Sequence, residues 1–247
     1  MALQPKFSII TITFNAASTI GPTLRSVKEQ TYTNYEYLLI DGGSGDGTVE
    51  KAMASGIGFA HIVSERDNGL YDAMNKGMAL ATGDYLCFLN AGDAFHAPDT
   101  LQTIVDAIEG ETELPHVLYG ETAVVDEERN FVRMRRLKAP EKLDWRSFRD
   151  GMLVCHQAFY ARRDIAPAYD LAFRLSSDVD WCIKVMKASS RLVNVRAVVV
   201  DYLQDGLSLR HHRASLIERF KVMSRHYGLL PTVFRHIWFV IRAVIKR

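Results

Sequence analysis

The chain has few of the features that mark membrane-spanning or disulfide-rich proteins. Its 247 residues include three cysteines, at positions 87, 155 and 182, whose spacing matches neither a disulfide framework nor a zinc site. No apolar run approaches the roughly 20 residues that cross a bilayer. No segment with the pattern of a signal peptide, a charged stretch followed by an apolar one, is expected before the strand-like segment that begins at Phe7. These absences predict a cytoplasmic protein with buried thiols.

A second absence concerns the first predicted strand. Residues 7–15, FSIITITFN, are rich in β-formers and end in polar residues, as a buried strand does. A dinucleotide-binding dehydrogenase would place Gly-x-Gly-x-x-Gly directly after this strand, and here Thr13-Phe14-Asn15 follows without such a loop. The sequence therefore argues against that class. With 48% hydrophobic residues, the chain can bury one large core.

The N-terminal segment predicts a βαβ unit. A helix is expected over residues 19–30 and a second strand over residues 35–40, so the two strands should be parallel. The loop DGGSGDGT, residues 41–48, follows the second strand. Its glycines allow a close backbone approach to a ligand, and Asp41 can accept a hydrogen bond from a base or ribose. The alternative is a glycine-rich turn that only starts the helix near Thr48.

Residues 65–93 predict a loop, a helix over 71–81 and a buried strand over 85–89. Asn90-Ala91-Gly92-Asp93 follows this strand directly. In open α/β sheets, ligands bind beyond the carboxyl ends of the strands, so a site is expected at this point. A carboxylate on a rigid strand end suits a divalent cation that faces phosphate oxygens.

The second half of the chain offers two further groups of polar residues. His156-Gln157 lies in the segment CHQAFYARR, and SSDVDW, residues 176–181, leads into a predicted helix. Asp178 and Asp180 are rival candidates for a catalytic carboxylate. Both could instead be first-turn acids that are favoured by the helix dipole. Ser176 is the more obvious cap, which leaves Asp178 free for another role.

These motifs together resemble the family 2 glycosyltransferases. The resemblance is carried by the Ala-x-Asn-x-Gly helix at residues 73–77, the loop at 41–48, the D-x-D-like Asn90–Asp93, the His-Gln-x-x-Phe pattern and Asp178 before a helix. It covers residues 5–210. It implies the GT-A fold, an α/β domain over residues 1–210 with a mostly parallel central sheet flanked by helices. A basic helical extension over residues 211–247 would follow.

The resemblance also implies residue roles. Asp178 would be the catalytic base, and Asp93 would hold Mn²⁺ or Mg²⁺, with His211 or His212 either a further ligand or a surface histidine. The nucleotide sugar would contact Thr13, Phe14, Asn15, Asp41, Asp67, Asn75 and Asn90. The acceptor side would include His156, Gln157, Asp180 and Trp181.

The activity implied is inverting transfer of a sugar from a UDP- or GDP-sugar to a glycan or lipid-linked glycan, closest to bacterial exopolysaccharide assembly of the colanic-acid kind. The base would take the proton of the acceptor hydroxyl as it attacks. Asn90, Gly92 and Ser177 depart from the family's usual acidic residues. The alternative is therefore a catalytically inactive carbohydrate- or nucleotide-binding protein on the same fold.

The C-terminal tail is basic and amphipathic. From Arg219 onward there are seven Lys or Arg and no acid; since the whole chain carries +1, the first 218 residues carry −6. The tail, residues 231–247, combines an apolar face that includes Trp238 with basic residues. It is expected to lie on an anionic membrane at the inner face of the cell, or else to pack on this domain or on a second subunit in a homodimer. No nucleic-acid-binding motif accompanies the basic residues.

Overall fold

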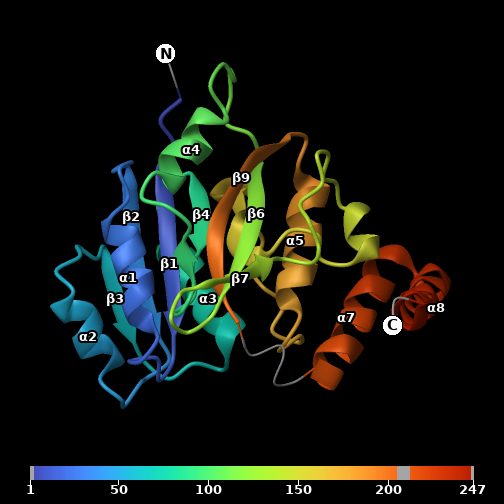
Figure 1. Cartoon of the computed structure of the whole chain (residues 1–247), viewed down its shortest axis with the longest axis horizontal. Helices are drawn as coiled ribbons and strands as arrows, with labels where there is room; N and C mark the ends of the chain where they lie inside the picture. The colour runs from blue at the N-terminus through green and yellow to red at the C-terminus, as the bar shows by residue number, and fades with distance from the viewer. Residues whose placement is uncertain (1–2, 205–211, 246–247) are drawn as a thin grey trace.

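The computed structural model describes residues 3–204 and 212–245, and four parallel strands form the N-terminal part of its central sheet (Figure 1). Their order is β3-β2-β1-β4, and every pairing among them is parallel. The strands are β1 (Phe7–Thr13), β2 (Tyr35–Asp41), β3 (His61–Ser64) and β4 (Tyr85–Phe88). They alternate with the helices α1 (Ile20–Lys28), α2 (Thr48–Ala54) and α3 (Leu70–Leu80). The predicted βαβ organisation is confirmed.

Apolar spacing explains why these elements pack as they do. Every residue of β1 is buried, as expected of a central parallel strand that is covered on both faces. Helix α1 buries Ile20, Leu24 and Val27, which are spaced along one helical face. In α3, Gly77 lies directly on the sheet, where an added Cβ would come within 2.5 Å of Ile10 Cγ2. The glycine of the Ala-x-Asn-x-Gly helix thus permits close packing of α3 on β1.

The second part of the sheet is mixed in direction. The order continues from β4 through β8 (Phe159–Arg162), β6 (Val117–Val125) and β9 (Leu192–Leu203) to β5 (Ala94–Phe95), and β7 (Phe131–Met134) pairs with β6. Strand β8 is antiparallel to both β4 and β6, whereas β6 and β9 are parallel. The expected parallel sheet therefore holds for the N-terminal part. Burial patterns in the sequence predict strands but do not set the direction of their pairing.

The remaining helical segments are α4 (Thr100–Asp106), α5 (Ser177–Ala188), α7 (His212–Tyr227), α8 (Leu229–Ile245) and the short 3₁₀ turns η1 (Ser147–Asp150), η2 (His156–Ala158) and η3 (Arg163–Ile165). Helix α7 contacts α5, and α8 contacts α7 and η1. Gly228, with φ of +88°, separates α7 from α8. None of the helices in the described part of the chain is both long and apolar enough to span a membrane.

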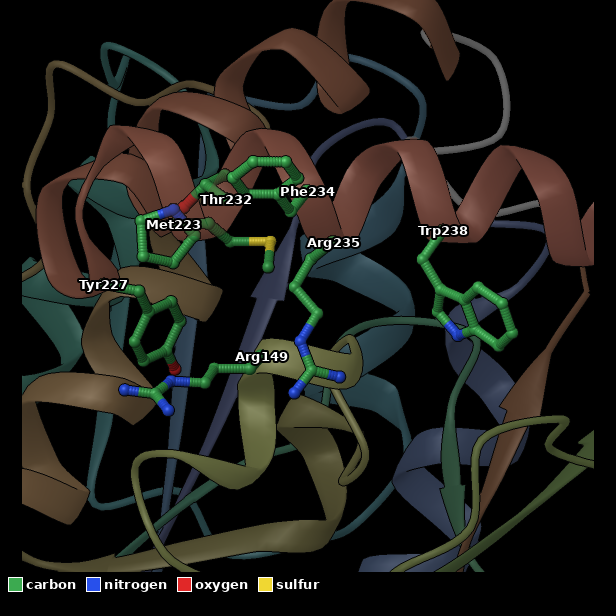
Figure 2. Close-up of a pocket in the computed structure, with 8 residues that line it drawn as sticks. Arg149, Met223, Tyr227, Thr232, Phe234, Arg235 and Trp238 are labelled. Carbon is green, nitrogen blue, oxygen red and sulfur yellow. The ribbon is translucent and has the colours of Figure 1, made fainter.

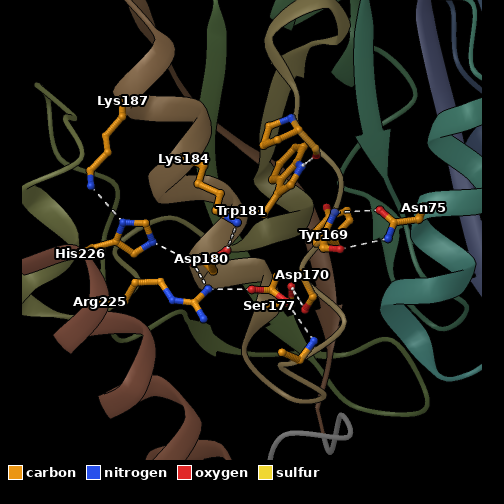
Figure 3. Close-up of polar contacts among 12 residues, drawn as sticks. Asn75, Tyr169, Asp170, Ser177, Asp180, Trp181, Lys184, Lys187, Arg225 and His226 are labelled. Carbon is orange, nitrogen blue, oxygen red and sulfur yellow. Dashed lines mark hydrogen bonds and ion pairs between the residues drawn. The ribbon is translucent and has the colours of Figure 1, made fainter.

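A buried charge cluster fastens α7 to α5 (Figure 3). Asp180 Oδ1 lies 2.8 Å from His226 Nε2, and Asp180 Oδ2 lies 2.6 Å from Lys184 Nζ. Burial by itself would raise the pKa of Asp180, but the hydrogen bonds from His226 and Lys184 outweigh burial and hold the pKa below its usual value. Arg225 of α7 also binds Asp170, in the loop before α5, at 2.6 Å. The C-terminal helices are thus tied to the core by ion pairs.

Removal of the Asp180 carboxylate should strongly destabilise the fold. Asp180→Ala leaves His226 and Lys184 without their partner, and loss of one member of a buried ion pair costs about 3–5 kcal/mol. The exposed pair that Asp164 forms with Arg162 at 2.7 Å provides the control. Asp164→Ala should change the free energy of unfolding by about 1 kcal/mol or less. Urea unfolding of both variants measures the difference.

The contribution of Asp180 to the free energy of unfolding should depend on pH. The folded pKa of Asp180 is depressed, so its stabilising effect is present above the unfolded pKa, about 4, and is lost as pH falls through the folded value. The stability gap between the wild type and Asp180→Ala should therefore narrow below about pH 4. Equal losses in the two alanine variants at neutral pH would contradict the structural role of this cluster.

Candidate active site

The site begins where the strand order reverses. β1 pairs with β2 on one side and with β4 on the other, so the loops that follow β1 and β4 leave the sheet at a topological switch point. Thr13 ends β1 and Asn90 follows β4. Thr13 Oγ1 and Asn90 Oδ1 are both buried, and neither has a hydrogen-bond partner among the described residues. Because unpaired buried oxygens are costly, they mark a place where a ligand can supply the missing donors.

Asp41 organises the loop that follows β2. Its Oδ2 accepts hydrogen bonds from the backbone N–H groups of Gly43 and Ser44, at 3.1 and 2.8 Å, and from Ser64 Oγ at 2.6 Å. Its Oδ1 accepts from Ser44 Oγ at 2.5 Å. Asn15 braces the same loop, because its Oδ1 accepts from the Gly45 N–H. In this conformation Asp41 acts by shaping residues 41–48, and its predicted contact with the nucleotide stays a prediction.

An aromatic ring and a carboxylate flank this loop. Phe14 is 64% exposed directly after β1, which is unusual for a phenylalanine beside a buried strand. A Cβ on Gly42 would lie 2.6 Å from Asp67 Oδ2 and 3.2 Å from Phe14 Cδ2. The Gly69 N–H donates a hydrogen bond to Asp67 Oδ1 at 2.8 Å and so holds the Asp67 carboxylate in place. The absence of a side chain at Gly42 therefore lets Phe14 and Asp67 approach each other at the strand ends.

Asp93 is buried and fully engaged within the protein. Gln157 Nε2 donates to Asp93 Oδ2 at 2.8 Å, and the Leu203 N–H donates to Oδ1 at 3.0 Å. Burial raises the pKa of Asp93 to about 7, although these two hydrogen bonds and the charge of Arg129 act in the opposite direction. Arg129 reaches the same loop and donates to the Gly92 carbonyl oxygen at 2.7 Å. Asp93 and Gln157, expected on opposite sides of the site, are thus direct partners.

The side chains near Asp93 do not by themselves make up a divalent-cation site. Both Asp93 oxygens already accept hydrogen bonds, its carboxyl is partly protonated near neutral pH, and Gly92 supplies no side chain. Across residues 3–204 and 212–245 no three His, Cys, Asp or Glu side chains gather into a metal-binding group. Hard cations need several oxygen ligands. His211 lies outside the described residues, as does the side chain of His212.

Asp178 has the geometry of an available base. It is half-buried in the first turn of α5, where Oδ1 accepts from Tyr71 Oη at 3.0 Å and from the Val179 N–H at 2.9 Å. No donor among the described residues contacts Oδ2. Burial, and then the negative charge of Asp178, raise the pKa of Tyr71 well above its usual value, so Tyr71 stays a donor. Tyr71 lies four residues after Asp67 in the sequence and holds the Asp178 carboxylate.

Several predicted site residues lie behind this surface. Trp181 is completely buried and donates to the Pro167 carbonyl oxygen at 2.7 Å. His156 Nε2 lies 2.5 Å from Tyr169 Oη, and burial lowers the pKa of His156 to about 4, so its ring is neutral. Asn75 exchanges two hydrogen bonds with the backbone of Tyr169, at 3.1 and 2.8 Å (Figure 3). Trp181 and His156 are buried and support the loop before α5 from inside, and the half-buried Asn75 holds the backbone of the same loop.

Two residues that sequence reasoning missed hold Asp178 in place. One is Tyr71, which the sequence pattern marked only as the start of a helix. The other is Glu218 of α7, whose carboxylate accepts from the N–H groups of Arg174, Leu175 and Ser176, at 3.1, 2.7 and 3.1 Å. Asp180 points to α7 as described above, away from this surface. The signal for Glu218 was its place as the last acid before the basic tail, but no local pattern names its partners.

The sequence matches the family model "Glycosyl transferase family 2" over residues 8–167. That segment covers more than half of the chain and contains β1 to β4 with their loops. The chain belongs to glycosyltransferase family 2. A PGL/p-HBAD biosynthesis glycosyltransferase of Mycobacterium bovis is 36% identical over 254 residues, covering 98% of this chain and 95% of the relative. The amylovoran biosynthesis glycosyltransferase AmsB of Erwinia amylovora is 26% identical over 79% of this chain and 69% of AmsB.

Solved structures confirm the GT-A fold of this family member. The crystal structure of S. aureus TarS 1-349 has a TM-score of 0.71 at 17% identity, over 95% of this chain and 72% of that one. The mannosyltransferase PcManGT from Pyrobaculum calidifontis, in complex with GDP-Man and Mn²⁺, has a TM-score of 0.61 at 18% identity, over 90% and 65%. At these identities the likeness concerns the fold, and the residue roles rest on the geometry of this chain.

The exposed ring of Phe14 should contribute to nucleotide binding. A base stacked on an aromatic side chain gains about 1–3 kcal/mol, so Phe14→Ala should weaken binding of the preferred nucleoside diphosphate by roughly fivefold to a hundredfold. Phe234, which is 70% exposed on α8, is the matched control, and Phe234→Ala should bind as the wild type does. Isothermal titration calorimetry measures both. Unchanged affinity in Phe14→Ala would remove this ring from the donor site.

The raised pKa of Asp93 predicts a pH-dependent stability. Its folded pKa of about 7 exceeds the unfolded value of about 4, so protonation favours the folded state. This stabilisation is complete below about pH 4 and is lost as pH rises through about 7. Asp93→Asn carries no charge, so it should gain in stability relative to the wild type between pH 5 and pH 8. Parallel pH profiles in urea unfolding would contradict the assignment.

Proposed function

We propose that this chain is an inverting glycosyltransferase that moves a sugar from a nucleoside-diphosphate sugar to a glycan or lipid-linked glycan. The observation that carries the proposal is the half-buried Asp178, with one oxygen fixed by Tyr71 and the other without a protein donor. The relatives are named for PGL/p-HBAD biosynthesis and for amylovoran biosynthesis, and these names support the acceptor class. Assembly on a lipid carrier would take place at the inner face of the membrane.

The donor class is a UDP- or GDP-sugar. TarS 1-349 has been crystallised with UDP-GlcNAc, and PcManGT with GDP-Man. In this chain the nucleotide would lie over loop 41–48, against Phe14 and Asp67, with hydrogen bonds to the unpartnered Thr13 Oγ1 and Asn90 Oδ1. The expected dependence on Mn²⁺ or Mg²⁺ remains a prediction from the sequence. Donor binding measured with and without either ion tests it.

In the proposed reaction, Asp178 accepts the proton of the acceptor hydroxyl. The hydroxyl oxygen forms a bond to the anomeric carbon as the bond from that carbon to the phosphate oxygen breaks, and the nucleoside diphosphate leaves with the electron pair. Attack from the face opposite the leaving group inverts the anomeric configuration. Tyr71 and the Val179 N–H orient the carboxylate, and Glu218 fixes the backbone directly before it.

Loss of the base should abolish most of the transfer without loss of the donor. Asp178→Asn keeps an oxygen for Tyr71 but cannot take a proton, so transfer should fall about a hundredfold to ten-thousandfold. Donor affinity by calorimetry should be nearly unchanged. Asp99, an exposed residue at the start of α4, is the control, and Asp99→Asn should retain full activity.

The assay begins with a screen of UDP- and GDP-sugars for release of the diphosphate. Near-normal transfer by Asp178→Asn would overturn the assignment of the base. A wild-type protein that binds nucleotide but releases no diphosphate from any donor, with glycan or lipid-linked acceptors present, would favour the inactive binding protein. The buried, fully engaged Asp93 is the structural feature that gives weight to that alternative.

A further inference from the structure

Helix α8 presents an apolar stripe to solvent. Leu230, Phe234, Ile237, Trp238 and Ile241 follow one another at helical spacing along one face, and they are 70, 70, 52, 51 and 43% exposed. The opposite side of the helix faces the protein: Thr232 is buried, and the His236 ring contacts the Phe220 ring of α7. An amphipathic helix normally buries its apolar side on its own domain. Here the apolar side is turned outward.

The stripe continues into a pocket between η1, α7 and α8 (Figure 2). The pocket has a volume of about 560 Å³. Its lining includes Phe234 and Trp238 from the stripe, Met223 and Tyr227 from α7, and the two arginines Arg149 and Arg235. The pocket therefore joins apolar walls to guanidinium groups, which suits a ligand that has both an apolar and an anionic part.

Two arginines line this pocket, and only one of them is paired with an acid among the described residues. Arg149 lies 5.7 Å from the centre of the Trp145 ring and 5.3 Å from that of Tyr227. Its Nε is buried without a hydrogen-bond partner, and no described carboxylate pairs with it. Arg146 and Lys187 also lie over the Trp145 ring, at 4.9 and 4.7 Å. Arg235, by contrast, is paired with Asp150. The pocket wall is therefore positively charged, with Arg149 available to an anion.

We propose that the stripe of α8 and this pocket dock on an anionic lipid bilayer, with a phosphate headgroup against Arg149 and the stripe among the acyl chains. A helix with Trp, Phe and Leu on one face and nearby cations lies in the membrane interface in this manner. Anionic lipids add roughly 1 kcal/mol of attraction for each Lys or Arg at the surface. This docking rests on the proposed function, in which a lipid-linked glycan is assembled at the membrane, and it names the residues that would contact that membrane.

A second copy of the chain fits this face less well. In a two-fold dimer the same patch meets itself, so the cations around Trp145 on one copy would approach those on the other. Asp150 on this face is already paired with Arg235, and no carboxylate among the described residues forms an ion pair with Arg149. A bilayer that carries negative headgroups satisfies both the apolar and the charged parts of the face.

The test uses the full-length wild-type protein and vesicles of phosphatidylcholine, with or without about one third phosphatidylglycerol. We expect co-sedimentation with the anionic vesicles only, weakening as salt is raised. The double variant Phe234→Ala with Trp238→Ala should reduce partitioning at least tenfold, because both rings leave the interface. Arg149→Gln should reduce it about fivefold. Phe131→Ala and Arg133→Gln, at exposed positions on β7, should bind as the wild type does.

Other outcomes would overturn the proposal. Equal binding to neutral and anionic vesicles would show that Arg149 does not recognise a headgroup phosphate. Absence of binding at low salt would show that this face does not dock on a bilayer. Release by millimolar glycerol phosphate would point to a soluble phosphate ligand. A wild-type dimer in sedimentation equilibrium that dissociates in the Phe234→Ala, Trp238→Ala variant, without vesicle binding, would make the face a contact between copies. Thermal unfolding by circular dichroism confirms that each variant is folded.

This result is separable from the catalytic proposal. Vesicle binding uses no sugar nucleotide and no residue near Asp178. Failure of vesicle binding with intact transfer to a soluble acceptor would reject the docking surface alone. Failure of transfer with intact vesicle binding would reject the proposed base alone.

Discussion

The parallel pairing of β1 with β2 and β4 is the constraint on which the site depends. Parallel strands end at the same edge of the sheet, so the loops after β1, β2 and β4 meet there although they are far apart in the chain. All seven residues of β1 are buried, as expected of a strand at the centre of the parallel part of the sheet. Thr13, Asp41 and Asn90 converge for this reason.

The C-terminal helices contact the segment that carries Asp178. Glu218 of α7 accepts three backbone N–H groups immediately before α5, and His226 of α7 binds the buried Asp180 of α5. Asp178 is therefore positioned from two directions, by Tyr71 of α3 and by α7. The boundary expected near residue 210 separates segments of the sequence, but contacts between α5 and α7 cross it. If α8 docks on a membrane, α7 connects that surface to the loop before the base.

Asp93 illustrates how environment changes the role of a motif residue. A carboxylate after a strand reads as a metal ligand, yet here Gln157 and Leu203 occupy its oxygens and burial raises its pKa to about 7. These partners come from positions 64 and 110 residues further along the chain. Trp181 and His156 show the same effect, because both are enclosed by aromatic neighbours and act behind the surface. A motif gives the residue type and place, and its neighbours set its protonation and exposure.

The sequence by itself determined the βαβ start, the glycine-rich loop, the helix over Gly77 and the basic amphipathic tail, because each of these depends on periodicity or on a local backbone requirement. It also predicted a ligand site at the strand ends, since parallel strands must end together. Only the tertiary structure decided that β8 runs antiparallel, that Asp178 contacts Tyr71 whereas Asp180 contacts α7, and that α8 turns its apolar stripe outward. Asp178 and Asp180 are two residues apart on one helix, so the sequence places them on different faces of that helix. Which of these faces meets α7 is set by long-range packing and charge.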